Sequence, residues 1–405
     1  MDLVSPESVD MDSAQLERIG EHLGTRYVDA GKIPGSLTLV ARGGQPCYLD
    51  VRGMRDVERA TPMSADSILR IYSMTKPITS VALMTLHERG LFSLDDPVHR
   101  FIPEWRNLAV WKAGSYPLFA TEPVKRPMTI RDLLMHTSGL TYDFLRASNI
   151  DYAYRKEQVG APRAGYTLRE MIDQLAHLPL EFSPGERWNY SLATDVLGYL
   201  IEVMSGQSLP DFLQQTVFDP LGMCDTGFEI GSDKVARFAS CYERNLKKEM
   251  VLQDDGQNSR YRQCSFYSGG GGLISTIGDY HRFCQMLLQG GTLDGQRVIG
   301  PRTLAFMRQN HIPGGADMSA FATGGFSESA YEGVGFGLGF ATLIDPVRNG
   351  HPASAGTYYW GGLASTVFWV DPVEELTVVF MTQLMPSSTF DFRGQLENIV
   401  YGALR

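Results

Sequence analysis

The stretch Ile68-Leu69-Arg70-Ile71-Tyr72-Ser73-Met74-Thr75-Lys76-Pro77 decides the fold, because it leads from a short apolar strand into a long helix. Pro77 fits the first turn of a helix, where a missing N–H costs little, and Gly90 ends the apolar pattern that follows. Three residues is nearly one helical turn, so Ser73 and Lys76 share a face, at the positive end of the helix dipole. The tetrad therefore pairs a nucleophile with an amine, although it also fits an ordinary helix start with a solvated lysine.

Length and composition indicate a globular protein that does not bind polyanions. The chain has 405 residues, 43% of them hydrophobic and 20% charged, which suffices for one large domain or two interlocked ones. Forty-six acidic residues against 36 basic ones give a formal net charge of −10, and no long run of like charge occurs. We therefore expect neither a nucleic-acid partner nor a membrane partner.

The cysteines and histidines argue against disulfides, metals and cofactors. The five cysteines are odd in number, widely spaced and without a C-x-x-C, so we expect buried, reduced thiols. The eight histidines have no metal-ligand spacing, and we expect no metal and no other cofactor. Residues 1–14 lack the basic and apolar segments of a signal peptide, and no apolar stretch reaches about 18 residues. These features predict a soluble cytoplasmic protein.

Apolar periodicity predicts strands near both ends of the chain and helices between them. The early part reads as a helix over 13–30 and strands over 36–40 and 47–51, joined by the turn Arg42-Gly43-Gly44-Gln45. Further helices are expected over 130–134, 166–177, 193–204, 210–217, 277–288 and 390–404, and further strands over 336–340, 365–370 and 376–381.

This distribution predicts a mixed α/β (α+β) fold made from both ends of the chain. We expect residues 1–90 and 271–405 to form one mixed domain, with 91–270 inserted as a mainly helical domain. The cleft between two such parts is the natural place for an active site. The glycine run 269–272 lies at the boundary, as a hinge or as a point of tight packing.

Two more motifs follow the S-x-x-K in a set order, Tyr190-Ser191-Leu192 and then Trp360-Gly361-Gly362. Together they resemble the serine β-lactamases and penicillin-binding proteins and, more narrowly, the family VIII carboxylesterases, the esterase relatives of class C β-lactamases. The resemblance covers nearly the whole chain, and the segment Leu134-x-His136-Thr137-Ser138-Gly139-Leu140 belongs to the wider superfamily. It implies a serine β-lactamase/DD-peptidase-like fold, with a central antiparallel sheet flanked by helices. No G-x-S-x-G occurs, so the nucleophile elbow of α/β-hydrolases is absent.

The chain departs from the class C pattern at two motifs. Leu192 stands where those enzymes have the asparagine of Tyr-x-Asn, and Trp360 stands where they have the lysine of Lys-Thr-Gly. The missing groups would hold the polar substituents and the carboxylate of a β-lactam. Their replacement by apolar side chains favours uncharged esters, as expected of the esterase branch.

Acyl transfer needs a nucleophile, a base and donors for an oxyanion. Ser73 is the candidate nucleophile, and Lys76 and Tyr190 are the candidate bases. An ammonium near a phenol favours the phenolate, so Lys76 would lower the pKa of Tyr190 and let it act as base and then as acid. The reverse assignment, with neutral Lys76 as the base, stays open, and we expect the pair to titrate as a unit.

The resemblance also suggests which other residues contact the substrate. It implies an oxyanion hole made of the backbone N–H groups of Ser73 and Leu363. Trp360, Gly361, Gly362, Tyr142 and Leu192 are the candidate substrate-binding residues, although Tyr142 and Trp360 fit core packing equally well.

Two more polar residues near the motifs receive a structural interpretation. The resemblance makes His136 structural. Asp195 fits a residue that orients a catalytic group, but it is more typical of a helix cap or a surface carboxylate.

The sequence therefore predicts a serine carboxylesterase that hydrolyses short-chain acyl esters through an acyl-enzyme on Ser73, with weak or no β-lactamase activity. A β-lactamase or D-amino-acid peptidase, an acyltransferase that uses the same acyl-enzyme, and a non-catalytic binding protein of this fold are the alternatives. The expected partner is a small-molecule ester. The natural ester, the acyl-chain preference, the stereoselectivity and the oligomeric state do not follow from the sequence.

Overall fold

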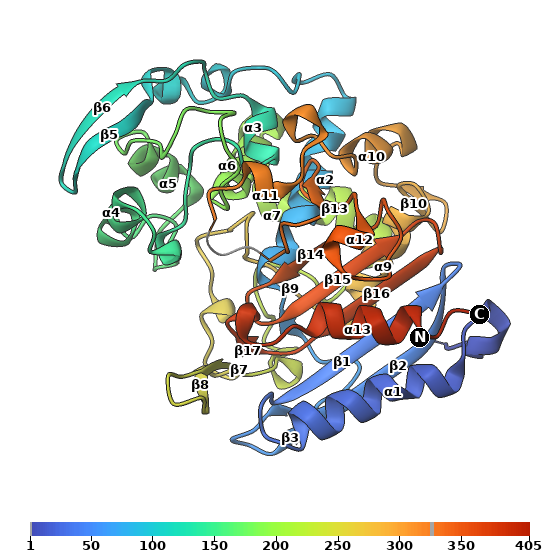
Figure 1. Cartoon of the computed structure of the whole chain (residues 1–405). Helices are drawn as coiled ribbons and strands as arrows, with labels where there is room; N and C mark the ends of the chain where they lie inside the picture. The colour runs from blue at the N-terminus through green and yellow to red at the C-terminus, as the bar shows by residue number, and fades with distance from the viewer. Residues whose placement is uncertain (1, 325–327) are drawn as a thin grey trace.

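The computed structural model describes residues 2–324 and 328–405, and its centre is one antiparallel sheet (Figure 1). Among the described residues the sheet has eight strands in the order β12-β13-β14-β15-β16-β1-β2-β3. Their bounds are β1 Gly35–Arg42, β2 Gln45–Asp56, β3 Thr61–Pro62, β12 Val334–Phe336, β13 Ala341–Leu343, β14 Tyr358–Gly362, β15 Thr366–Asp371 and β16 Leu376–Met381. Because β1 pairs with β16, with Leu39 opposite Val379, the first and last parts of the chain share this sheet. The predicted mixed fold with a central antiparallel sheet is confirmed.

The hairpin β1–β2 forms where the sequence predicts it, because its turn suits two glycines. Gly43 and Gly44 have φ of 56° and 76°, a left-handed conformation that glycine adopts without the steric penalty of a side chain. The strand β1 is buried along nearly its whole length, as its unbroken apolar and small residues require.

Helices cover the two faces of the sheet (Figure 1). The helices α1 (Ser13–Leu23) and α13 (Phe392–Tyr401) contact each other and lie in front of the strands, and α9 (Ile277–Leu288) packs on β15 and β16 from behind. The helix predicted over 13–30 ends at Leu23 and continues as a wider turn through Val28. The helix predicted over 390–404 begins two residues later, where Asp391 caps the amide of Gly394.

The residues between the two parts of the sheet carry most of the remaining helices. Those helices are α3 Ile130–Leu134, α4 Asn149–Glu157, α5 Leu168–Leu175, α6 Ala193–Ser205, α7 Leu209–Leu213 and α8 Asp219–Leu221. After them come α10 Pro301–Met307, α11 Met318–Phe321 and α12 Pro346–Asn349. The predicted division into 1–90 with 271–405 and an inserted 91–270 stays a prediction.

The same segment also contains strands that periodicity did not reveal. The hairpin of β5 (Ala109–Ser115) and β6 (Leu118–Pro123) projects at one end of the molecule (Figure 1). The other short strands are β4 Leu69–Arg70, β7 Cys241–Arg244, β8 Met250–Asp254, β9 Ile274–Ser275, β10 Thr292–Leu293, β11 Gln296–Arg297 and β17 Leu384–Met385. Of all these strands, β5 to β8 lie within 91–270, the segment that the sequence predicts as mainly helical, and periodicity indicated none of the four.

One predicted strand is a turn. The stretch 337–340 joins β12 to β13, with the Gly337 amide bonded to the Phe340 carbonyl. Gly339 has a φ of 94°, and a Cβ there would lie 2.3 Å from Ser80 Oγ, so glycine is needed for the bend. The apolar residues of this stretch are buried because the hairpin packs on the helix α2 (Thr75–Glu88), not because the chain is extended.

The structure can be compared with two expectations from the sequence, one about membrane-spanning segments and one about the cysteines. None of the helices in the described ranges has the length and apolar character needed to cross a membrane. All five cysteines are free thiols, but Cys224 is exposed and Cys264 is half-buried, so the expectation that all are buried is wrong.

Candidate active site

Ser73 lies at the junction between the sheet and the helix α2 (Thr75–Glu88), in a 3₁₀ turn over Tyr72–Met74. The chain reaches this turn from β4, which pairs with β9, and the side chains around it are buried. Tyr72 has a φ of 42°, a left-handed value that costs a residue with a side chain roughly 1–2 kcal/mol. This backbone turn leaves Ser73 with 9% of its surface exposed at the start of the helix.

Lys76, on the first turn of α2, is buried against the serine. Its Nζ lies 3.3 Å from Ser73 Oγ and donates a hydrogen bond of 2.7 Å to the carbonyl of Gly270. Burial lowers the pKa of Lys76 to about 8, while the carboxyl groups of Asp195 and Glu328 act in the opposite direction. A substantial fraction of this amine is therefore neutral at mildly alkaline pH.

Tyr190 stands across from Lys76, three residues before α6 begins at Ala193. The Lys76 Nζ lies 4.6 Å from the centre of the Tyr190 ring. Burial raises the pKa of Tyr190 well above its usual value, and Glu328 adds to this shift, while hydrogen bonds from Ser73 and Trp360 oppose it. The electrostatics thus disagree with the expectation of a low pKa for Tyr190 and favour Lys76 as the group that becomes neutral.

Aromatic packing fixes the position of Tyr190. Its ring contacts the rings of His136, Tyr142, Trp188 and Trp360, with centroid separations between 5.1 Å and 6.1 Å. Aromatic pairs at such distances add to the stability that burial alone gives. The phenol is therefore held in one place by rings from its own loop, from the stretch 136–142 and from β14.

His136 holds the tyrosine motif through the neighbouring serine. It is buried, its φ is 57°, and its Nδ1 lies 3.1 Å from Ser191 Oγ. Burial lowers the pKa of His136 well below its usual range, and Lys76 lowers it further, so the ring is neutral. This placement agrees with the structural role that the resemblance implies for His136.

Asp195 is the clearest departure from the sequence interpretation. Its side chain is wholly buried on the first turn of α6 and accepts hydrogen bonds from Ser268 Oγ and the Gly270 amide. The interpretation as a cap or surface carboxylate is wrong, because the cap position of α6 is Leu192. Through Gly270, whose N–H binds Asp195 and whose carbonyl binds Lys76, this carboxyl fixes the backbone that holds the lysine.

The glycine run 269–272 is a place of tight packing. A Cβ on Gly270 would lie 2.5 Å from Asp195 Oδ2, and one on Gly269 would lie 2.8 Å from the Thr194 carbonyl. Contacts this short exclude any larger residue without a shift of the backbone. Glycine here lets the chain pass between α2 and α6.

The third motif forms the end of β14, next to the turn that carries Ser73. A Cβ on Gly362 would lie 2.3 Å from the Ile71 carbonyl, so glycine admits the backbone that precedes the nucleophile. Leu363 follows at once in a turn, and the role of its amide in an oxyanion hole stays a prediction. Trp360 is 1% exposed and packs between Tyr190 and Phe336, so it supports the phenol from behind.

A cavity of about 670 Å³ opens beside Tyr72, the residue that precedes Ser73. Tyr142 and Leu192 line it, but Ser73, Lys76 and Tyr190 do not. Trp360, Gly361 and Gly362 are likewise not among its lining residues. Contact between these three residues and a substrate stays a prediction.

Glu328 is a site residue that sequence reasoning missed. It is 8% exposed, its Oε2 lies 3.4 Å from the position of a Cβ on Gly361, and burial raises its pKa to about 7. No motif surrounds it, and it reaches the site from a segment far from all three motifs in sequence. Only the folded chain brings it within electrostatic range of Lys76 and Tyr190.

Comparisons with known proteins agree with this geometry. The family model described as Beta-lactamase matches residues 21–400. The chain is 34% identical to Protein Rv1367c of Mycobacterium tuberculosis, over 90% of this chain and 89% of that one. It is 32% identical to Esterase EstB of Burkholderia gladioli, over 94% and 93% of the two chains. The solved structure of EstCE1, a hydrolase with promiscuous acyltransferase activity, superposes with a TM-score of 0.81 at 28% identity, over 96% of this chain and 99% of that one.

Proposed function

Because this chain belongs to the beta-lactamase family, we propose that it is a serine esterase of that family, close in type to the family VIII carboxylesterases. Ser73 is the nucleophile of this proposal, and Lys76 and Tyr190 are its proton-transfer partners. The observation that carries it is the buried Lys76 amine, 3.3 Å from Ser73 Oγ and with a pKa of about 8. The similarity to an esterase over 94% of the chain supports the choice of ester as substrate.

Acylation begins when neutral Lys76 takes the proton of the Ser73 hydroxyl. The serine oxygen then forms a bond to the ester carbonyl carbon, and the carbonyl oxygen becomes an oxyanion. The N–H groups of Ser73 and Leu363 are the candidate donors to this oxyanion, at the start of α2 and the end of β14. These donors act with little reorganisation because both segments are packed against each other.

Collapse of the tetrahedral intermediate breaks the bond to the alcohol, which leaves with a proton. The Tyr190 phenol, whose pKa is raised, is neutral and can pass that proton to the alkoxide while it takes one from Lys76. Water then attacks the acyl-enzyme by the same route, releases the acid and restores Ser73. In this scheme Tyr190 is a shuttle and Lys76 is the base.

Esters rather than β-lactams fit the second and third motifs. A β-lactam carries a carboxylate close to its scissile amide, and Trp360 offers no positive charge to hold it. Leu192 likewise offers no amide to the substrate. Each missing partner leaves a polar group unpaired, which costs on the order of 1–3 kcal/mol. The nitrogen of an amide is also a poorer leaving group than an alkoxide, so its departure depends more on protonation.

Acyl transfer to an alcohol is a second candidate function. The solved structure of a hydrolase with promiscuous acyltransferase activity matches nearly the whole chain, and the cavity beside Ser73 has room for an acceptor. Adding an alcohol during ester hydrolysis and analysing the products separates the two functions. A new ester that forms in proportion to the alcohol concentration supports transfer, and the free acid alone supports hydrolysis.

The test of the proposed function compares an ester with two lactams on one preparation. We expect kcat/KM for p-nitrophenyl butyrate to exceed the values for nitrocefin and benzylpenicillin by at least about 100-fold, the equivalent of two unmade hydrogen bonds. Comparable values for the ester and the lactams would favour the β-lactamase or peptidase alternative. No turnover of any of them would favour a non-catalytic protein of this fold.

A further inference from the structure

The cavity beside Ser73 is much larger than an acetyl or butyryl group requires. Its volume is about 670 Å³, against roughly 30 Å³ for the share of one water molecule in the liquid. Pockets of roughly 300–1,000 Å³ enclose ligands of drug size. A short acyl chain at Ser73 would therefore leave most of this space filled with water.

The walls of the cavity change in character from its inner end to its outer end. Near the catalytic groups the lining is aromatic and aliphatic: the Tyr142 ring centre lies 5.2 Å from that of Tyr190, and Leu192 belongs to the tyrosine motif itself. Towards the exterior two arginines, Arg163 and Arg260, join the lining. Among the described residues that line the cavity, Asp143 is the only one with a carboxyl group, and burial raises the pKa of that group.

The two guanidinium groups have no ion-pair partner among the residues that the structure describes. Arg163 lies over the Tyr166 ring, 3.6 Å from its centre, and donates to the Gln158 carbonyl. Arg260 lies 5.6 Å from the centre of the Tyr261 ring, and its side chain remains exposed in the cavity wall.

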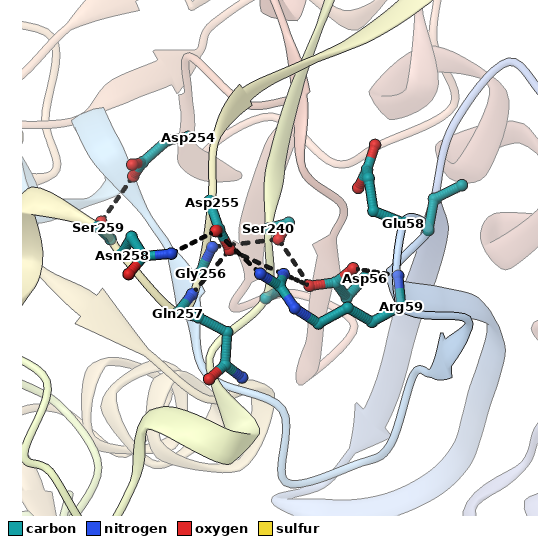
Figure 2. A network of polar contacts seen from close by, with 12 residues as sticks. Asp56, Glu58, Arg59, Ser240, Asp254, Asp255, Gly256, Gln257, Asn258 and Ser259 are labelled. Carbon is teal, nitrogen blue, oxygen red and sulfur yellow. Dashed lines mark hydrogen bonds and ion pairs between the residues drawn. The ribbon is translucent and has the colours of Figure 1, made fainter.

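A network of polar contacts fixes the loop that carries Arg260 (Figure 2). Arg59 binds both carboxylate oxygens of Asp255, at 2.8 Å and 2.9 Å, and also binds Asp56 at 2.6 Å. These bonds lower the pKa of Asp255 to about 2, so the network persists across the working pH range. Ser259, the cap of the 3₁₀ turn Arg260–Arg262, donates a 2.7 Å hydrogen bond to Asp254.

This anchoring matters because a guanidinium held on a fixed turn loses less conformational entropy when it binds an anion. The neighbouring cavity wall is supplied by Tyr261 and Gln263, which follow on the same loop. The outer end of the cavity is thus a fixed wall with an available positive charge.

From these contacts we propose that the cavity accepts the larger part of an amphipathic ester whose apolar body lies along Tyr142 and Leu192 and whose remote carboxylate binds Arg260. The inference rests on the proposed esterase function and names its substrate class. It differs from β-lactam recognition in one respect. The carboxylate of a β-lactam lies next to the scissile bond, where Trp360 stands, whereas here the charge must lie several atoms away from the ester.

Two matched pairs of esters test this proposal. In the first pair the charge lies in the acyl part: mono-p-nitrophenyl suberate is compared with p-nitrophenyl octanoate. In the second pair it lies in the alcohol part: 6-(butanoyloxy)hexanoate is compared with hexyl butanoate, followed by acid release at constant pH. The quantity measured is the ratio of kcat/KM for the anionic ester to that for the neutral one.

Arg260→Gln should lower this ratio about fivefold to tenfold in at least one pair, because a hydrogen bond to a charged group is lost from a partly exposed site. Turnover of the neutral esters should stay within about twofold. Arg262→Gln is the matched control, since Arg262 lies on the same turn, carries the same charge, is exposed and does not line the cavity. The control should leave both ratios unchanged.

An unchanged ratio in both pairs for Arg260→Gln, or an equal fall for Arg262→Gln, would overturn the proposal. Either result can be told from failure of the proposed function, because the wild type would still hydrolyse p-nitrophenyl butyrate. Absence of any ester turnover by the wild type would instead refute the esterase function itself.

Discussion

The two ends of the cavity beside Ser73 differ in how far the nearby ionisable groups are exposed to water. Next to the inner end, although not in the lining itself, Lys76 and Tyr190 are 2% and 1% exposed, and each is fixed by contacts from several segments. At the outer end Arg163 and Arg260 are exposed and have no carboxylate partner among the described residues. Both ends carry positive groups, but only the inner one has removed them from water.

This difference in exposure assigns the chemical step to the buried groups and the choice of substrate to the exposed ones. Burial lowers the pKa of Lys76 to about 8, so a lysine becomes a base that works near neutral pH. An exposed arginine keeps its charge and can attract an anion without changing the reactivity of Ser73. Substitutions at the inner end should therefore change kcat, and substitutions at the outer end should change the preference among substrates.

The largest effect is expected from removal of the nucleophile. Ser73→Ala should lower kcat/KM for p-nitrophenyl butyrate by at least about 10³-fold, because no other group can form the acyl-enzyme. Ser265→Ala is the control at the outer end, where the hydroxyl lines the cavity and donates only to the Arg163 carbonyl. The kcat/KM of this control variant should stay within about twofold of the wild-type value. Equal losses in the two variants would abolish the distinction between the ends.

The next effect concerns the proton-transfer pair. Lys76→Ala and Tyr190→Phe should each lower kcat by about 10²–10⁴-fold, the usual contribution of general acid–base catalysis. Since the two groups act on the same proton, the double variant should be scarcely slower than either single one. Losses that multiply would mean that the lysine and the tyrosine act independently. Thermal unfolding of all three variants checks that each is folded.

A smaller effect is expected from pH. If neutral Lys76 is the base, kcat/KM should rise about tenfold between pH 7 and pH 9, because a group with a pKa of about 8 is about one-tenth neutral at the first and nine-tenths neutral at the second. If the base were a Tyr190 phenolate stabilised by the lysine cation, kcat/KM would fall above pH 8 instead. A pH profile with substrate blanks at each point decides between these two assignments.

The smallest effect should come from Glu328, the buried carboxyl near Gly361. Above its pKa of about 7 the negative charge of Glu328 raises the pKa of Lys76. Glu328→Gln removes that charge, so the rise of kcat/KM should begin at lower pH, by less than about one unit. The exposed Glu332 supplies the control variant Glu332→Gln, which should leave the profile in place. A shift to higher pH in Glu328→Gln would contradict this electrostatic account.

Much of the fold could be predicted because its signals are local. The glycine turn of the β1–β2 hairpin, the buried run of β16 and the apolar stripe of α9 each decide their own structure within a few residues. The strands of the β5–β6 hairpin were missed because that hairpin is largely exposed and lacks a clear apolar alternation. The turn over 337–340 was misread because burial by a neighbouring helix resembles burial within a sheet.

The residues of the site were likewise predictable only where their signals are local. Ser73, Lys76 and Tyr190 stand in motifs whose order is visible in the sequence, and the fold brings them together. Asp195 was misjudged because its partners, Ser268 and the Gly270 amide, lie more than seventy residues away and give no local sign. Whether Lys76 or Tyr190 is the base stayed open for the same reason, since desolvation of the lysine depends on its whole surroundings and not on a tetrad.

Covalent trapping tests directly whether Ser73 is the nucleophile. The chain is treated with a p-nitrophenyl alkylphosphonate ester until p-nitrophenyl butyrate turnover stops, then digested and analysed by mass spectrometry. We expect one phosphonyl adduct per chain, on Ser73, formed in proportion to the loss of activity and absent from Ser73→Ala. An adduct on any other serine that tracks the loss of activity, or a fully labelled Ser73 with activity retained, would contradict it.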